Sequence, residues 1–258
     1  MRILFVGDIV GRCGIDAAFE NIPDIKEKYG IDLCIVNAEN AAGGFGATRD
    51  TLSDLERAGA DAFTLGNHAF SKAEISSILC ENSFDIIRPE NFANGEAGEG
   101  VMIVRAKNGQ RVGVINLLGK LYVDVCDKSP FDVVDSLVER VKEKTDIIIV
   151  DIHAEATSEK KALGYYLDGK VSAVFGTHTH IQTSDEEIFD GGTAYITDVG
   201  MCGAKNSVLG AEISAAIAKF THEGRGKYKA ASGEKIFCAV VIEVDENGKT
   251  LKIERIRI

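Results

Sequence analysis

Short polar segments follow five apolar runs of the sequence, and together they hold most of its histidines. The segments are Gly7-Asp8, Asn37-Ala38-Glu39-Asn40, Gly66-Asn67-His68, Asp151-Ile152-His153 and Gly176-Thr177-His178-Thr179-His180. Four of the five histidines lie in these segments, and only His222 lies elsewhere. In open α/β sheets, ligands bind beyond the carboxyl ends of the strands. If the apolar runs are strands, the five segments are expected to converge on one site.

The side chains of these segments are typical metal ligands. His178 and His180 are two residues apart, so on an extended segment both imidazoles project to the same side. The other donors are two carboxylates, an amide and a third imidazole, carried by Asp8, Glu39, Asn67 and His153. A donor set without thiolate favours Mn, Fe or catalytic Zn over a structural zinc site. Because these donors are too many for one tetrahedral ion, the set predicts two ions that share a carboxylate.

Two adjacent metal ions predict hydrolysis of a phosphate ester. Ions about 3.5–4 Å apart can bind both the attacking and the leaving oxygen, and they lower the pKa of a bridging water so that hydroxide forms near neutral pH. His68, next to the candidate ligand Asn67, is then available to protonate the leaving oxygen. The alternative is that His68 only donates a hydrogen bond to a metal ligand.

The charge balance limits the class of substrate. The chain has 40 acidic and 29 basic residues and a net charge of −11. Such a surface repels a long phosphate backbone, so we expect no long nucleic acid as a partner, whereas a small anionic substrate is compatible with it. Arg49 and Lys205 could bind an anion, but solvated surface charge is the simpler interpretation. The metal ions are therefore expected to supply the positive charge.

The apolar runs are expected to be strands that are covered on both faces, because they are apolar throughout rather than alternating. They occupy residues 3–6, 33–36, 62–65, 147–152 and 173–175. Asn108-Gly109 and Asn247-Gly248 each separate two further strand-like runs, which predicts antiparallel hairpins. The strands need covers in both halves of the chain, so we expect one α/β domain over residues 1–258, with facing sheets and helices outside.

Two patterns predict helix starts. Ser71 with Glu74 forms a capping box, and Ser129-Pro130 opens a segment with one apolar helical face. The beginning of the chain lacks the features of a signal peptide, and no apolar stretch approaches the roughly 18 residues needed to cross a bilayer. We therefore expect a cytoplasmic protein without a membrane partner. Cys34 and Cys238 lie in strand-like runs and are expected to be buried, reduced thiols.

The five polar segments, in their order, resemble the motifs of calcineurin-like metallophosphoesterases. Residues 37–46, 155–160 and 195–201 are more closely similar to the bacterial YmdB-type phosphodiesterases, and the similarity extends over essentially the whole chain. The resemblance implies a four-layer α/β/β/α sandwich of two mixed β-sheets flanked by helices. It also implies a two-metal centre that hydrolyses phosphodiesters, with 2′,3′-cyclic nucleotides as the expected substrates and 3′,5′-cyclic nucleotides as a second option.

The resemblance also assigns the ligands by motif. One ion would be bound by Asp8, Glu39, Asn40 and His180. The second ion would share Glu39 and would also be bound by Asn67, His153 and His178, with His68 as the general acid. The usual Asp-x-His opening of the superfamily is Asp8-Ile9-Val10 here, and Glu39 replaces the usual bridging Asp. Because the first ion then has few nitrogen donors, Fe or Mn is expected rather than Zn, which stays possible.

Several roles are open on the sequence alone. Asp151 and Asp198 could orient metal-bound imidazoles or cap strand ends. Glu155 and Thr157 could shape the cleft, and residues 42–46 could be a mobile substrate loop or a tight connection. The C-terminal hairpins could pair subunits into a homo-oligomer. Two other functions also stay open, namely a phosphomonoesterase or nucleotidase, and a regulatory protein that senses metal or nucleotide with incidental catalysis.

Overall fold

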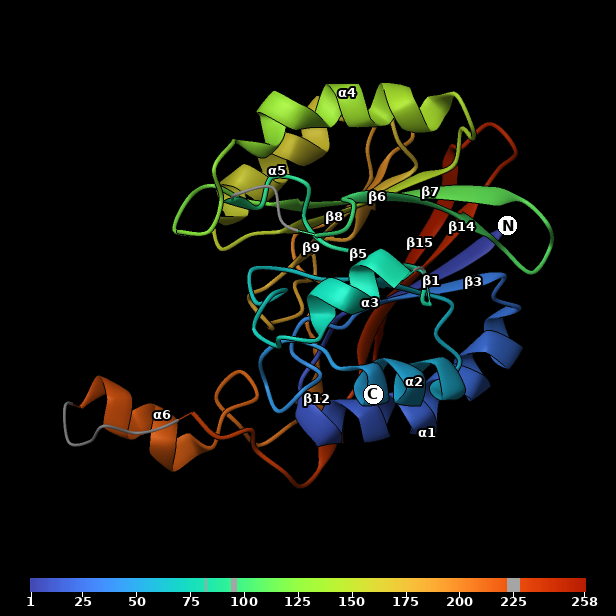
Figure 1. The fold of residues 1–258 in the computed structure, drawn as a ribbon. Helices are drawn as coiled ribbons and strands as arrows, with labels where there is room; N and C mark the ends of the chain where they lie inside the picture. Colours follow the sequence, from blue (N-terminus) through green and yellow to red (C-terminus); the bar gives the residue numbers. More distant parts are fainter. Residues whose placement is uncertain (82, 94–96, 222–227) are drawn as a thin grey trace.

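The computed structural model describes residues 1–81, 83–93, 97–221 and 228–258, so His222 lies outside the described residues. Two six-stranded sheets face each other in the middle of the molecule, with helices on both outer sides (Figure 1). The predicted four-layer α/β/β/α sandwich is therefore confirmed. None of the helices in the described ranges combines the length and the apolar composition needed to cross a lipid bilayer.

The first sheet combines four parallel strands with an antiparallel hairpin. Its order is β15 (Thr250–Arg257), β14 (Cys238–Val244), β1 (Arg2–Val6), β3 (Leu33–Asn37), β4 (Ala62–Thr64) and β5 (Ile86–Ile87). Strands β14 and β15 pair antiparallel around Asn247-Gly248, as predicted. Gly248 has a φ of 80°, a conformation that glycine adopts without steric cost.

The second sheet has a parallel centre and antiparallel edges. Its order is β10 (Glu187–Ile188), β11 (Ala194–Ile196), β9 (Ala173–Thr177), β8 (Ile148–His153), β7 (Arg111–Leu118) and β6 (Val101–Arg105). The β6–β7 hairpin around Asn108-Gly109 is also confirmed. A small third sheet contains β13 (Lys235–Ile236), β12 (Met201–Ala204) and β2 (Asp8–Ile9), and it pairs Asp8 with Met201.

Alternate residues of the central strands face opposite sides of each sheet. Ile3 and Phe5 of β1 lie in the core between the two sheets, where the rings of Phe5 and Phe175 have centroids 5.2 Å apart. Leu4 and Val6 belong instead to the core beneath the helices of the first sheet. Burial on both faces explains why these runs are apolar throughout.

Helices cover the outer face of each sheet (Figure 1). Helices α1 (Gly11–Tyr29) and α2 (Arg49–Ala58) cover the first sheet, and α4 (Pro130–Lys142) and α5 (Thr157–Tyr166) cover the second. Helix α4 begins as predicted, because the side chain of Ser129 accepts a hydrogen bond from the backbone N–H of Phe131. Helix α6 (Ile213–Phe220) projects from the body of the molecule and has no buried residue.

One predicted helix start is wrong. Helix α3 (Ile75–Glu81) begins after Glu74 instead of just after Ser71. The backbone N–H of Ser71 donates to the carbonyl oxygen of His68 at 3.0 Å, and the Glu74 carboxylate accepts a 3.5 Å hydrogen bond from the backbone N–H of Arg49. Both groups that the capping box required thus have other partners. Cys34 and Cys238 are buried and free, and burial raises the pKa of both thiols.

Candidate metal centre

The five polar segments meet at one edge of the facing sheets. The segments containing Asp8, Glu39 and Asn67 follow strands of the first sheet, and those containing His153 and His178 end or follow strands of the second. Two groups of side chains there could each hold a metal ion: Glu39 with His153 and His178, and Asp8 with Glu39 and His180. Within each group the donor atoms lie within 4.8 Å of one another. Glu39 is common to both groups, as the prediction of a shared carboxylate required.

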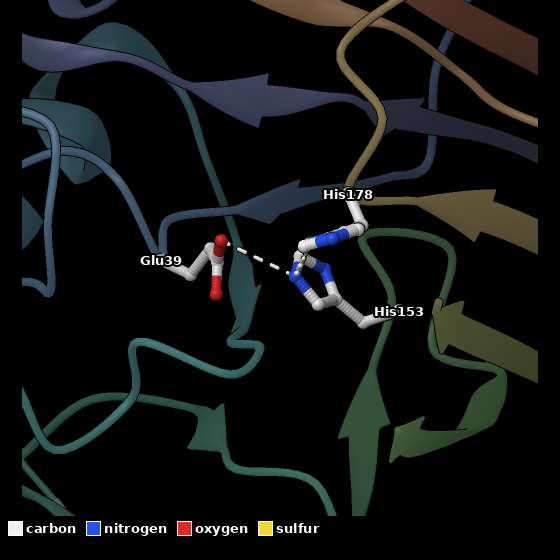
Figure 2. A group of neighbouring side chains, drawn as sticks. All are labelled: Glu39, His153 and His178. Atoms are coloured by element: carbon white, nitrogen blue, oxygen red, sulfur yellow. Dashed lines mark hydrogen bonds and ion pairs between the residues drawn. The ribbon is translucent and has the colours of Figure 1, made fainter. Parts of the chain in front are cut away.

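The first of these groups is centred on the His153 ring (Figure 2). Its Nε2 atom lies 3.2 Å from Oε1 of Glu39, 2.9 Å from Oδ1 of Asn67 and 3.1 Å from Nδ1 of His178. Four electron-rich atoms are thus crowded together in a site where His153 is fully buried. One shared proton cannot satisfy all four, whereas a cation can accept lone pairs from each of them.

The second group contains an unsatisfied buried carboxylate. Asp8 is completely buried, and its Oδ1 atom has no hydrogen-bond partner among the described residues. This atom lies 3.8 Å from Nε2 of His180. The side-chain nitrogen of Asn40 donates to Oε1 of Glu39 at 2.8 Å and lies 3.2 Å from Nε2 of His180. An unpaired buried carboxylate oxygen is costly, so the donor set at Asp8 fits a metal ion.

A chain of hydrogen bonds sets the orientation of the His153 ring. Nδ1 of His153 lies 2.9 Å from Oγ1 of Thr177, and the Thr177 hydroxyl donates to Oδ1 of Asp151 at 2.7 Å. The other oxygen of Asp151 accepts from Thr64 at 2.5 Å and from Asn37 at 3.1 Å. Because the single Thr177 proton goes to Asp151, His153 donates from Nδ1 and keeps its Nε2 lone pair for the site. Asp151 therefore orients His153 through Thr177.

His178 and His180 reach the site in a different way from the one expected. Strand β9 ends at Thr177, and the φ angles of His178 and His180 are 96° and 64°, so the segment is not extended. The two rings enter different donor groups rather than projecting side by side. A left-handed conformation costs a residue with a Cβ atom about 1–2 kcal/mol. Strain of this kind persists only where the surroundings enforce it.

Asp198 supplies much of that enforcement. Its Oδ2 atom accepts hydrogen bonds from the backbone N–H of Thr179 at 3.0 Å and from the Thr179 hydroxyl at 2.7 Å. The buried ammonium of Lys160 lies 2.8 Å from the same oxygen. Asp198 thus anchors the turn between His178 and His180. Of the two roles that the sequence left open for Asp198, the contacts fit a cap on the end of the strand and not the orientation of an imidazole ring.

The second nitrogen of each of these two rings also has a partner. Nε2 of His178 lies 3.1 Å from Oε2 of Glu155, and Nδ1 of His180 lies 3.0 Å from the carbonyl oxygen of Leu209. When these outer nitrogens carry the protons, Nδ1 of His178 and Nε2 of His180 are free to act as ligands. Glu155 also lines the cleft, as expected from the sequence. Thr157 is the first residue of α5.

Burial and mutual charge shift the pKa values in opposite directions. Burial raises the pKa of Asp8 to about 6, although the nearby His180 and His153 rings act to lower it. Burial also acts to raise the pKa of Glu39, but His153 and His68 outweigh it and lower the value. For His178, burial and the His153 charge lower the pKa to about 3. Burial acts to lower the pKa of His153, but the negative charges of Glu39 and Asp8 outweigh burial and raise the pKa to about 9. The site thus attracts positive charge to its centre, either a second proton on His153 or a metal cation that takes the place of that proton.

His68 lies at the mouth of the centre. Its backbone N–H donates to Oε2 of Glu39 at 3.0 Å, and its ring Nε2 lies 3.4 Å from the side-chain nitrogen of Asn67. Burial is the main cause of a lowered pKa for this ring, partly offset by Glu39. Gly66 makes the close approach possible, because a Cβ atom there would lie 2.3 Å from Oε2 of Glu39.

A cleft of about 410 Å³ opens onto these residues. His68, His178 and His180 line it, and Gly44 and Phe45 of the 42–46 segment do so as well. The segment therefore lies on the cleft side. Arg49 and Lys205 lie elsewhere in surface ion pairs, Arg49 with Glu81 and Lys205 with Glu234.

Sequence reasoning missed several residues of the site. Thr177 lies inside one of the polar segments, but no local pattern indicated its role as the partner of His153. Leu209, Lys219 and Tyr228 line the cleft from a distant part of the chain, and no local pattern marks them either. Their positions depend on the tertiary structure.

The fold and this donor arrangement define the class. Two facing sheets flanked by helices, with a carboxylate shared between two histidine-containing donor groups at one edge, identify a metallophosphoesterase. Residues 4–256 match the family model described as YmdB-like protein, and the chain belongs to this family. The family prediction is thereby confirmed.

Individual relatives agree with this assignment. The 2′,3′-cyclic-nucleotide 2′-phosphodiesterase of Bacillus subtilis (strain 168) is 44% identical over 259 residues, covering 100% of this chain and 97% of the relative. A solved structure of a novel phosphatase from Mycoplasma pneumoniae has a TM-score of 0.92 at 36% identity, covering 100% of this chain and 93% of that one. The solved structure of a hypothetical protein from Thermus thermophilus has a TM-score of 0.92 at 39% identity, covering 100% of this chain and 99% of that one. The relatives whose names give an activity are enzymes, which confirms the prediction of an enzyme.

Proposed function

We propose that this protein is a dinuclear metal-dependent phosphodiesterase that hydrolyses small phosphodiesters, with 2′,3′-cyclic nucleotides as the main substrates. The observation that carries the proposal is the position of Glu39, whose carboxylate belongs to both donor groups. The activity for which the 44% identical relative is named supports the choice of substrate. The net charge of −11 supports a small substrate rather than a long nucleic acid.

The two donor groups divide the ligands between two ions. Asp8, Glu39, Asn40 and His180 would hold one, and Glu39, Asn67, His153 and His178 would hold the other. Bound transition-metal ions supply positive charge for the phosphoryl oxygens and lower the pKa of a nucleophilic water. We propose Mn or Fe rather than Zn, because the group around Asp8 has a single imidazole and is otherwise rich in oxygen and amide donors.

The protein's own residues then position the ester and transfer a proton. Attack of a water oxygen on phosphorus forms one P–O bond and breaks the bond to the leaving ribose oxygen, and the proton that the water loses passes to solvent. We assign His68 as the general acid that gives its ring proton to that oxygen, since it lines the cleft beside Asn67. Thr177 and Asp151 hold the His153 ring in place during this step.

Metal analysis combined with paired substrates tests the proposal. Purified protein should contain about two transition-metal ions per chain and should cleave bis(p-nitrophenyl) phosphate and 2′,3′-cyclic AMP after Mn or Fe reconstitution. Rates on 3′,5′-cyclic AMP and on p-nitrophenyl phosphate, measured in the same preparation, serve as comparisons. Faster cleavage of the monoester would favour the phosphomonoesterase alternative. Absence of metal-dependent hydrolysis would overturn the enzymatic proposal and favour a regulatory role.

A further inference from the structure

A second cavity lies beside the metal-bearing cleft, and its character is different. It has a volume of about 280 Å³, and apolar side chains line most of it, among them Val208, Ala215, Ala216 and Phe220. Three residues, Phe45, Lys219 and Tyr228, line both this cavity and the cleft at the metal centre. The two cavities are therefore adjacent compartments with a shared wall, one rich in metal-ligand side chains and one apolar.

We propose that this apolar cavity is a nucleobase-binding site, which holds the base of a nucleotide while its phosphate lies at the metal centre. The inference rests on the proposed function and names the recognition element of its substrate. A ligand that is charged at one end and flat and apolar at the other matches the two compartments. An aromatic base can stack on side-chain rings without hydrogen bonds between the protein and the edge of the base.

The shared wall provides aromatic surface at the right place. The rings of Phe45 and Tyr228 have centroids 4.4 Å apart at an interplanar angle of 60°. On its other side, Phe45 meets the His68 ring edge-on, with centroids 4.8 Å apart. The aromatic wall thus runs from the assigned general acid to the apolar cavity. Tyr228 is 38% exposed, so part of its surface is available for contact with a ligand.

Gly44 allows the Tyr228 ring to pack against Phe45. Its φ is 99°, and a Cβ atom at this position would lie 2.3 Å from the Tyr228 ring. Any larger residue would therefore push Tyr228 away from Phe45. The glycine lets the backbone of the 42–46 segment support the ring directly.

Lys219 supplies a charge between the two compartments. It is the only lysine or arginine among the described residues that line the metal-bearing cleft. A cation at this boundary suits the phosphate of a ligand whose base occupies the apolar side.

The lining also determines what kind of base selectivity to expect. The described residues around the apolar cavity include no amide or carboxylate side chain that could read the edge of a base. Binding should therefore depend on stacking area, and purines should bind more tightly than pyrimidines. Adenine and guanine should differ little.

The first experiment compares substrates that differ only in the base. In metal-loaded protein, Tyr228→Ala should raise KM for 2′,3′-cyclic AMP about tenfold with little change in kcat. KM for 1-O-methyl-ribose 2,3-cyclic phosphate, which has no base, should stay unchanged. Tyr228→Phe keeps the ring and should behave like the wild type. An equal loss on both substrates would overturn the inference, whereas a wild type without diesterase activity would instead overturn the proposed function.

The second experiment needs no turnover. Adenosine, which carries the base and no phosphate, should give saturation-transfer difference NMR signals on its purine protons with the wild-type protein. Ala216→Phe fills the cavity and should abolish them. Ala218→Phe adds the same ring to the same helix at a position that does not line the cavity, and should retain them. Equal signals from both variants, or none from the wild type, would refute a nucleobase site.

Discussion

Oε1 of Glu39 lies 3.2 Å from Nε2 of His153, so the segment after β3 of one sheet touches the end of β8 of the other. This contact joins the two halves of the sandwich at their carboxyl edge. Because Glu39 also lies in the donor group of Asp8 and His180, its carboxylate links every part of the site. Removal of that one charge should affect both proposed ions.

Glu39→Gln tests the shared carboxylate. The substitution keeps the size of the side chain and removes the negative charge that both groups use. We expect metal content to fall to one ion or fewer per chain and diester turnover to fall more than about 100-fold, because a direct ligand should matter more than the outer partners of metal ligands. Elemental analysis together with a diester assay measures both. Retention of two ions with full activity would contradict the shared site, and circular dichroism controls for folding.

His68→Ala separates catalysis from metal binding. Because His68 is assigned to the leaving oxygen and not to a metal, the variant should keep its metal content. Loss of a general acid should lower kcat by about 10²–10⁴-fold. The loss of kcat should be smaller for the diester bis(p-nitrophenyl) phosphate, whose leaving group needs little protonation, than for a cyclic nucleotide. An equal loss on both esters would point to a structural role for His68.

Thr177→Val tests the hydrogen bonds that orient His153. Valine has nearly the shape of threonine but cannot connect Nδ1 of His153 to Asp151. We expect metal affinity to weaken about 10–100-fold, as is usual when the partner of a ligating histidine is lost. A metal-competition titration measures this, and Thr177→Ser, which keeps the hydroxyl, is the matched control. If the valine and serine variants bind metal equally well, the hydroxyl has no positioning role.

Asp185 should contribute stability that depends on pH. Burial acts to raise its pKa, but hydrogen bonds from Thr183 and Thr197 outweigh this and leave the pKa below its ordinary value of 3.8. A lowered folded-state pKa means that the contribution is present above the unfolded-state pKa and is lost as pH falls through the folded value. Asp185→Asn should therefore cost up to about 1 kcal/mol in unfolding free energy at pH 7, given partial exposure to solvent.

Urea unfolding at several pH values checks this expectation. The difference between wild type and Asp185→Asn should be constant from about pH 7 down to about pH 5 and should shrink below about pH 4, where the carboxylate takes up its proton. A difference that grows as the pH falls would have the wrong sign for a depressed carboxyl pKa.

Local sequence patterns determined much of the fold and most of the candidate ligands. Buried strands need apolar residues on both faces, so β1, β3, β4, β8 and β9 were visible as apolar runs. The turn chemistry of Asn108-Gly109 and Asn247-Gly248 is also local, because it depends on which residues accept a positive φ. The candidate ligands could be located because each apolar run is followed directly by a polar segment, and this change marks the end of a buried strand.

Only the tertiary structure decided how those ligands are arranged. The left-handed conformations of His178 and His180 depend on Asp198 and Asp8, which lie elsewhere in the sequence, and they send the two rings into different donor groups. Lys219 and Tyr228 reach the cleft from near α6, with no local pattern to mark them. A sequence reveals what neighbouring residues prefer, whereas contacts across a fold depend on the packing energy of the whole chain. That is why residue types and strand ends were readable in advance and the geometry between them was not.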